Sequence, residues 1–557
     1  MTDAGTHLRS RTLAVVALCA LTLAACDASG DGAETSRPRA GGTLTVAILE
    51  PKSIDPSRTS DADRAGERPG LLVLSALCDP LVAADPRTGA LRPGVAESWQ
   101  VALDGKKVTF KLRAGARFHN GREITAEDYV YSISRFVHPD TSSDQYFFFE
   151  RVAGYKDLRE RRSQTLAGVK ALDPRTLEVE LAEPFAELPA VLAHPAAGSV
   201  VPKDEVAKGA DAFAMAPVCN GPYAMAAPWQ RGQDLRLVRA KDYSRTSSVH
   251  SRDGAGYADE IVFKTVPDLE AGYKLLEEKA VQVADVPVNR IAPGRVRGLR
   301  IENRSNGLLS YLGFPVTRPP FDKPEVRRAL SLALDRSEIV DTLLAGTREV
   351  ATGFLPGSAG RAARGAACPD TIKAKVDARG ASTALQAAGV DPAATKLTVY
   401  FNDGASGHQA WLEKVAGQWK SALKLDSTLQ PQEFKLYLDF LAEGKADGPF
   451  RLAWPADYPS PESIFGPLFA GGSLDNYTMF RNQAFDDLLA RARATPDERA
   501  RRGVYTEAAK VLCSEMPAAP VWFGANHIGL AAGLPSAVRS PTGLLGEPLV
   551  RELGTRS

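Results

Sequence analysis

The stretch LRPGVAESWQVALDGKKVTFKLRAGARFHNGREITAEDYVYSISRFVHP, residues 91–139, carries the strongest local structural signals in the chain. Alternating apolar residues predict a strand at 107–113, and the Asn-Gly step of FHNG (118–121) is typical of a hairpin turn. Thr125 and Asp128 then form a capping box before YVYSISRFV, in which apolar residues recur on one face of a helix. The stretch therefore indicates a chain that mixes strands and helices.

The same signals recur on both sides of this stretch. Alternation predicts further strands at 43–49, 176–181, 234–240, 260–266 and 397–401. Asp322 with Glu325, and Thr495 with Pro496 and Glu498, are typical of helix starts. Strands and helices alternate irregularly, so we expect α/β or α+β domains around mixed sheets. The length of 557 residues exceeds one core and suggests two to four domains.

The N-terminus has the pattern of an export signal. Arg9 and Arg11 precede the apolar run LAVVALCALTLAA, which is too short for a comfortable membrane span and is followed by Cys26. The end of the run, LAAC, resembles the bacterial lipobox, which implies a lipoprotein signal peptide at 1–25 and a lipid on Cys26. The polar composition of segment 26–41 predicts a disordered tether. A plain signal peptide and a short anchor are the alternatives.

Cysteine usage fits an exported chain. Four cysteines remain after the signal and the lipidation site, namely Cys78, Cys219, Cys368 and Cys513. An even number in an oxidising compartment predicts disulfides, and four cysteines allow three pairings between which the sequence alone does not choose. None has a zinc-like spacing, so we expect no metal site and no cofactor.

Composition and motifs exclude several function classes. With 68 Lys and Arg against 67 Asp and Glu, the chain lacks the basic excess that nucleic acid demands. It contains no G-x-S-x-G, H-E-x-x-H, Walker or G-x-G-x-x-G motif, and its seven histidines are scattered. An exported chain without recognisable catalytic motifs indicates a ligand-capturing receptor and not an enzyme.

Several long segments are similar to one family. Residues 91–139 resemble the signature region of the extracellular solute-binding proteins of peptide ABC transporters. SIDP (53–56), NGPY (220–223) and PPFDKPEVRRALSLALDRSEIV (319–340) fit the same family, and 432–523 resembles its oligopeptide-binding branch. The resemblance covers nearly all of the chain beyond the tether.

The resemblance implies a periplasmic-binding-protein-like type II fold, with two lobes joined by crossing strands and one extra inserted domain. The implied boundaries are 42–78, 199–305 and 519–557 for domain I, 79–198 for domain II and 306–518 for domain III. Ligand would be trapped between domains I and III by hinge closure. Placed on these domains, the cysteines favour the disulfides Cys78–Cys219, near the crossings between domains I and II, and Cys368–Cys513, within domain III.

The segment WPADYPSPESIF, residues 454–465, carries the expected binding residue. Its three prolines exclude a helix where they cluster. In the resembled family an Asp in a W-x-A-D-Y segment captures the α-ammonium group of a peptide, and Trp454, Asp457 and Tyr458 match that pattern. Asp457 is therefore expected to bind the amine and Trp454 to pack on the first side chain. The simpler alternative makes Asp457 a turn-former.

Three further positions are carried over from the resemblance. Phe434 stands where the family has a pocket Trp, Arg451 matches an Arg that meets a peptide carboxylate, and Tyr146 falls where domain II offers an aromatic ring. The alternatives are a core Phe434 and a solvated Arg451. Only Lys445 is available for a further basic position, which leaves recognition of the peptide's C-terminus open.

The resemblance also implies partners and a location. The expected protein is a monomer, held outside the bacterial cell membrane by its lipid, that passes peptides to the transmembrane subunits of an ABC permease with their ATPases. Alternatives with the same fold bind a nickel chelate, haem, a glycan or an opine, or act as a sensor or assembly factor. An exported hydrolase is the third alternative.

Overall fold

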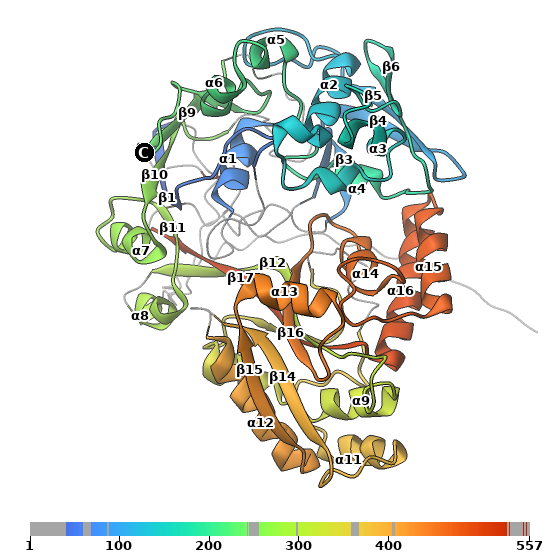
Figure 1. Ribbon diagram of the computed structural model, residues 1–557. Helices are drawn as coiled ribbons and strands as arrows, with labels where there is room; N and C mark the ends of the chain where they lie inside the picture. The colour runs from blue at the N-terminus through green and yellow to red at the C-terminus, as the bar shows by residue number, and fades with distance from the viewer. Residues whose placement is uncertain are drawn as a thin grey trace, which may run out of the picture. The chain divides into compact units, whose positions relative to one another are not determined.

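Figure 1 shows the computed structural model of the chain. The described residues are 41–59, 68–85, 89–241, 243, 256–296, 299–357, 367–403, 407–531, 534, 550 and 553. The expected signal peptide, Cys26 and nearly all of the tether lie outside them. None of the helices in these ranges combines the length and the apolar character that a membrane crossing requires.

The largest sheet joins the N-terminal strands to strands from the second half of the chain. Its order is β15-β14-β16-β12-β17-β11-β1-β10-β9-β8, with β13 paired to β17. The bounds are β1 Thr43–Leu49, β8 Tyr223–Met225, β9 Leu235–Arg239, β10 Glu260–Val266, β11 Val283–Asp285, β12 Arg300–Gly313, β13 Glu349–Val350, β14 Lys396–Asn402, β15 Asp426–Gln432, β16 Phe450–Pro455 and β17 Ala518–Leu530. Parallel and antiparallel pairs both occur, so the expected mixed sheet is confirmed.

Two long strands, β12 and β17, cross from one half of this sheet to the other (Figure 1). They pair antiparallel, and the register shifts between Ser305 and Leu309. Gly307 lies in that interval with a φ of 76°, a conformation that favours glycine. The crossing strands are therefore locally irregular at their middle, where a hinge between the two halves would bend.

The signature stretch forms two strands of a second, four-stranded sheet in the order β4-β5-β7-β6. Its strands are β4 Ala96–Val101, β5 Lys107–Leu112, β6 Val169–Asp173 and β7 Thr176–Glu180, and nearby β2 Val82–Ala84 pairs with β3 Leu91–Pro93. Helix α2 (Ala126–Val137) packs against β6 and β7. Its predicted cap is confirmed, because the Thr125 backbone N–H donates to the Asp128 carboxylate at 2.9 Å.

The remaining helices surround the sheets. They are α1 Pro69–Leu77, α3 Tyr155–Arg159, α4 Leu188–Val191, α5 Lys203–Val206, α6 Ala210–Met215, α7 Leu269–Glu277, α8 Ile291–Val296, α9 Pro324–Leu332, α10 Arg336–Glu338, α11 Ala378–Ala387, α12 His408–Leu423, α13 Phe434–Ala442, α14 Glu462–Phe469, α15 Gln483–Arg493 and α16 Glu498–Glu515, with a 3₁₀ turn η3 at Tyr146–Phe149.

Two of the predicted helix starts were wrong in detail. Helix α9 begins after Lys323 and has no side-chain cap, although Asp322 was expected to open it. Helix α16 is capped by Asp497, whose carboxylate accepts from the Ala500 backbone N–H at 2.7 Å. Thr495 instead donates its hydroxyl to the Arg491 carbonyl of the preceding helix, so it is not available as the cap.

Buried apolar residues form two main cores. The first core joins β1, α1, β10 and the four-stranded sheet with α2, and the second core lies between Leu309 and Phe523. Residues 79–198, the expected domain II, share the first core with domain I. We therefore propose that the three expected domains pack as two units, one made of domains I and II and the other of domain III. Tyr458 belongs to the first core although its segment lies within the residue range of the second.

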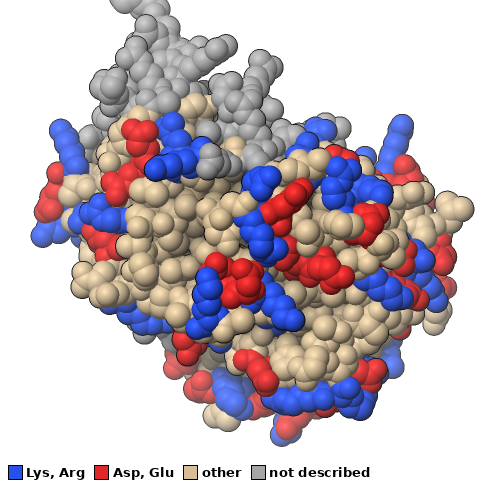
Figure 2. Space-filling view, turned by 90° about the horizontal axis from the view of Figure 1, so that it is seen from above, with Lys and Arg blue, Asp and Glu red and all other residues tan. Residues whose placement is uncertain are grey.

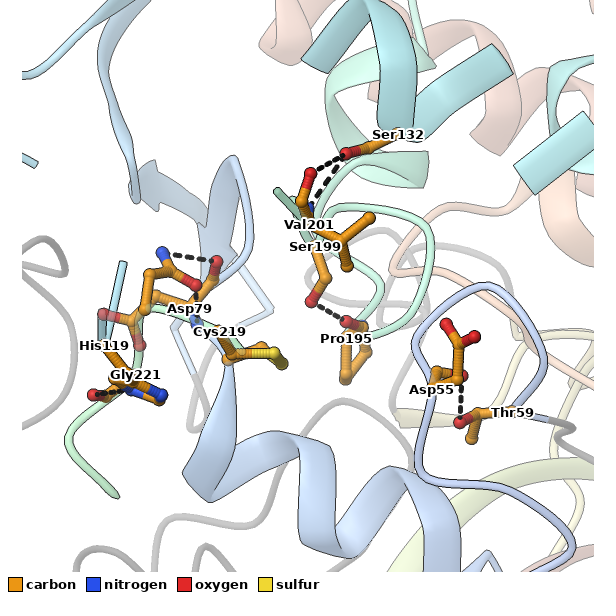
Figure 3. Close-up of a disulfide and its surroundings, with 12 residues drawn as sticks. Asp55, Thr59, Asp79, His119, Ser132, Pro195, Ser199, Val201, Cys219 and Gly221 are labelled. Carbon is orange, nitrogen blue, oxygen red and sulfur yellow. Dashed lines mark hydrogen bonds between the residues drawn. A yellow bond between two sulfur atoms is a disulfide. The ribbon is translucent and has the colours of Figure 1, made fainter. Parts of the chain in front are cut away.

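The structure contains the disulfides Cys78–Cys219 and Cys368–Cys513, with Cα–Cα distances of 5.0 and 5.4 Å. Around the first of them, at Cys219 and Asp79 in Figure 3, the Asn220 side chain accepts from the Asp79 N–H at 3.1 Å and donates to the Asp79 carbonyl at 3.2 Å. The disulfide and these hydrogen bonds tie the end of α1 to the segment before β8.

Charged side chains of both signs are intermixed on the surface. On the face shown in Figure 2, Lys and Arg side chains lie close to Asp and Glu side chains, with areas of other residues between them. This agrees with the formal net charge of +1. Mixed charge of this kind favours solubility and gives this face no extended field of a single sign.

Candidate functional site

Asp457 lies on the short segment that joins β16 to α14. Backbone hydrogen bonds fix its neighbours: the Ala456 N–H donates to the Gly307 carbonyl at 2.9 Å, and the Ser460 N–H to the Tyr458 carbonyl at 2.7 Å. Asp457 itself is only 8% exposed. The segment thus holds a carboxylate at low exposure next to the irregular middle of β12, where its interaction with a cation is stronger than in water.

The indole of Trp454 is anchored beside this carboxylate. Trp454 pairs with Leu309 in the β12–β16 ladder, and its Nε1–H donates to the Ser463 carbonyl at 2.8 Å. The ring packs partly against the second core and is partly exposed. An aromatic ring whose donor is already satisfied can serve as an apolar wall for varied side chains.

Tyr458 reaches across to the first core. Its ring meets the Phe148 ring edge-to-face at a centroid distance of 6.2 Å, and Phe148 in turn meets the His194 ring at 5.3 Å. Tyr146, the aromatic residue expected from domain II, lies under the Arg159 guanidinium, whose Cζ is 3.8 Å from the ring centroid, and its place in a binding pocket stays a prediction. The sequence analysis missed Phe148, although the run FFF at 147–149 was a signal that could have pointed to it.

Phe434 begins helix α13 and is 51% exposed. The buried Tyr437, one turn later, donates its hydroxyl to the Arg451 carbonyl at 2.7 Å and so ties α13 to β16. Within the described part of the chain, no ring contact joins Phe434 to Trp454 or Tyr458. Phe434 is therefore available on the surface of α13, and its place in a binding pocket stays a prediction.

Arg451 is a largely buried cation on β16. Its Nη1 donates to the Asn402 side-chain oxygen at 2.8 Å, while its Nε is buried and has no hydrogen-bond partner. Among the described residues no Asp or Glu forms an ion pair with it. Burial lowers the pKa of Arg451 to about 10, because the guanidinium has lost water without gaining a carboxylate. Such a group favours an incoming anion.

His408, the first residue of α12, lies close enough to Arg451 to be affected by its charge. Burial, and secondly the Arg451 cation, lower the pKa of His408 to about 4. The sequence analysis missed His408 and Asn402, because they lie more than forty residues upstream of Arg451 and no local motif links them to it. The three polar side chains come together only through the packing of β14, α12 and β16.

The arrangement suits a dipolar ligand. Arg451 and Asp457 carry opposite charges and are six residues apart on one segment, so their Cα atoms lie within about 20 Å of each other. No group of three or more His, Cys, Asp or Glu that could hold a metal ion occurs among the described residues. A ligand with a cation at one end, an anion at the other and apolar side chains between them would match these groups.

The chain is similar to proteins of a known family. Residues 90–476 match the family model of the bacterial extracellular solute-binding proteins, family 5. Two curated proteins of Escherichia coli (strain K12) are similar to this chain. The periplasmic murein peptide-binding protein MppA is 28% identical, with 85% of this chain and 86% of that protein covered. YgiS, named a probable deoxycholate-binding periplasmic protein, is 28% identical, with 84% and 86% covered.

A solved structure shows the same fold. The unliganded open form of MppA, a murein tripeptide-binding protein, superposes with a TM-score of 0.78 at 24% sequence identity, covering 94% of this chain and 99% of that one. The expected fold, that of the periplasmic binding proteins with an inserted domain, is therefore confirmed at the level of architecture.

Proposed function

Since this chain belongs to the bacterial extracellular solute-binding proteins of family 5, we propose that it captures short oligopeptides between its two lobes. It then delivers them, as a monomer, to the permease of an ABC importer. The observation that carries the proposal is the pair of poorly exposed, opposite charges on one segment, Asp457 and Arg451. A peptide in its zwitterionic form presents the two complementary charges.

Asp457 is the proposed partner of the peptide's α-ammonium group. An ammonium brought into a closed site loses water, and leaving its charge unpaired costs several kcal/mol, in the range of about 3–5. A carboxylate on a fixed, Pro-rich segment compensates that loss through a charge-assisted hydrogen bond. Trp454 and Tyr458 flank Asp457, and Phe434 and Tyr146 are proposed as further apolar walls, which accept varied side chains while backbone hydrogen bonds hold the peptide.

Arg451 is the proposed partner of the peptide's carboxylate. Its unsatisfied Nε and the absence of a carboxylate partner in the described ranges support this role. Because Arg451 and Asp457 are at most about 20 Å apart, an extended peptide that spans them has up to about six residues. His408 lies beside the proposed carboxylate position and is neutral at neutral pH, since its pKa is lowered to about 4.

Proton uptake tests this assignment. A carboxylate near His408 offsets the Arg451 charge, so the His408 pKa rises from about 4 and the protein takes up protons on binding at mildly acid pH. A rise of about one unit gives roughly 0.4 proton per peptide at pH 5. Calorimetry at pH 5, in two buffers of different ionisation enthalpy, measures the uptake for alanine peptides of two to five residues.

The controls separate the carboxylate from the rest of the peptide. C-terminal amidation of the peptide should weaken its binding and remove the proton uptake. Arg451→Gln should abolish the difference in affinity between the acid and the amide peptide. Arg318→Gln, at an exposed arginine of the same domain, should preserve the difference in affinity and the proton uptake. Equal proton uptake with acid and amide would show that the carboxylate lies elsewhere.

A ligand without an amine is the second candidate. The similarity to YgiS, named for deoxycholate, favours an organic anion with a large apolar body. Such a ligand would use Arg451 and the aromatic walls and leave Asp457 without a role. Binding that depends on Arg451 and is unaffected by substitution of Asp457 would support this second candidate over peptides.

We further propose that Cys26 carries a lipid that anchors the protein outside the cell membrane. Cys26→Ser is expected to release the mature protein from the membrane fraction without altering its unfolding temperature, because serine removes only the sulfur that would carry the lipid. Fractionation and immunoblotting of the variant and the wild type measure the release. Recovery of the processed variant in the membrane fraction would contradict the lipid anchor.

A further inference from the structure

Three buried contacts join residues of the inserted domain to residues in the range 458–501. The Arg501 Nε lies 2.8 Å from the Glu187 carboxylate. The Ala186 N–H donates to the Arg493 carbonyl at 2.7 Å. The third contact is the ring pair of Tyr458 and Phe148 described above. Residues 184–187 of the inserted domain therefore pack against the C-terminal end of α15 and the N-terminal end of α16.

The charged contact is almost completely shielded from water. Glu187 is 4% and Arg501 6% exposed. The Arg501 Nη1 is occupied within its own side of the contact, because it donates to the carbonyls of Thr495 and Pro496 at 2.8 and 2.9 Å. The Arg501 Nε–H points toward the inserted domain, where the Glu187 carboxylate is its partner.

Glu187 also touches the segment that carries Asp457. Burial raises the pKa of Glu187, and the hydroxyls of Ser460 and Tyr505 lie close enough to its carboxylate to oppose that rise in part. Two residues after Ser460, Glu462 accepts from Arg493 at 2.6 Å and from the Tyr505 hydroxyl at 3.2 Å. Ser460, Glu462, α15 and α16 thus form one connected body, and Glu187 binds that body three residues away from Asp457.

We propose that Glu187 is a positioning residue of the binding site, which latches the Asp457 segment to the inserted domain. The contact joins the inserted domain to domain III, because Glu187 is followed by Leu188 of the first core and Arg501 lies on α16, which packs into the second core. Separation of the two domains returns both charges to water, and removal of one partner leaves the other buried and unpaired. The inference rests on the proposed binding role of Asp457, and not on the ligand being a peptide.

Hydrogen exchange of the Ala186 amide measures the latch directly in the ligand-free protein. That amide donates across the contact, so its protection reports the fraction of molecules in which the two cores are together. Glu187→Gln keeps the shape and removes the charge, and it should reduce the protection about tenfold or more, as for loss of one partner of a buried charge pair. Mass spectrometry with fragmentation that resolves single amides gives the readout.

The control is Glu498→Gln, which breaks the exposed pair Glu498–Arg502 on the same helix α16 and should leave the Ala186 amide unchanged. The double variant Glu187→Gln/Arg501→Gln should lose no more protection than the worse single variant, since both destroy one interaction. A purely structural role would also expose the Ala190 amide, which donates to Glu187 within the inserted domain. The proposal is overturned if Ala186 is unprotected in the wild type, or equally protected in Glu187→Gln.

Discussion

Peptide affinity is expected to fall by roughly 30- to 5000-fold when Asp457 is replaced by alanine, the effect of truncating one partner of a buried charge pair. The variant leaves the peptide's ammonium without its carboxylate in a site that excludes water. The large effect depends on low exposure, and Asp457 is 8% exposed. Isothermal calorimetry with the alanine peptides measures the loss.

N-acetylation removes the same charge from the peptide side and completes a thermodynamic cycle. Wild type and Asp457→Ala are each measured with free and acetylated peptide, and the two losses should not add because each destroys the same interaction. Asp439→Ala, at an exposed ion pair with Lys435 on α13, is the matched control and should bind as the wild type does. If the wild type binds acetylated peptide as tightly as free peptide, Asp457 is a turn residue.

The second large effect concerns the stability of the fold. Asp55, in the SIDP segment, is fully buried and accepts two hydrogen bonds from the guanidinium of Arg135 on α2, at 2.8 and 2.5 Å. It also accepts from the Ser57 N–H at 3.0 Å. Asp55→Ala leaves Arg135 buried and unpaired, so we expect a loss of about 3–5 kcal/mol in the free energy of unfolding. Urea denaturation with intact disulfides, followed by circular dichroism, measures this loss.

The control for Asp55 lies on the same part of the chain. Asp144→Ala breaks the ion pair between Lys52 and Asp144, whose side chains are 62% and 50% exposed, and should change the stability little. An Asp55→Ala protein that unfolds at the same urea concentration as the wild type would show that Arg135 finds another partner or water. SIDP would then identify the family without holding the inserted domain to domain I.

Local signals in the sequence determined local structure. The strands at 43–49 and 107–113 and the capped helix after Thr125 are present, because alternation and capping act over a few neighbouring residues. Both cysteine pairs put forward from the family's domain order are present as well. The errors at Asp322 and Thr495 are errors of one or two residues, because α9 has no side-chain cap and α16 takes its cap from Asp497.

Only the tertiary structure decided which distant residues meet. Periodicity and motifs report on neighbours in sequence, whereas the environment of Arg451 comes from β14 and α12, and Tyr458 meets Phe148 from another domain. In the sequence, Glu187 is one acidic residue among 67 Asp and Glu. Packing against Arg501 alone distinguishes it, because burial converts an ordinary surface charge into one that requires a partner.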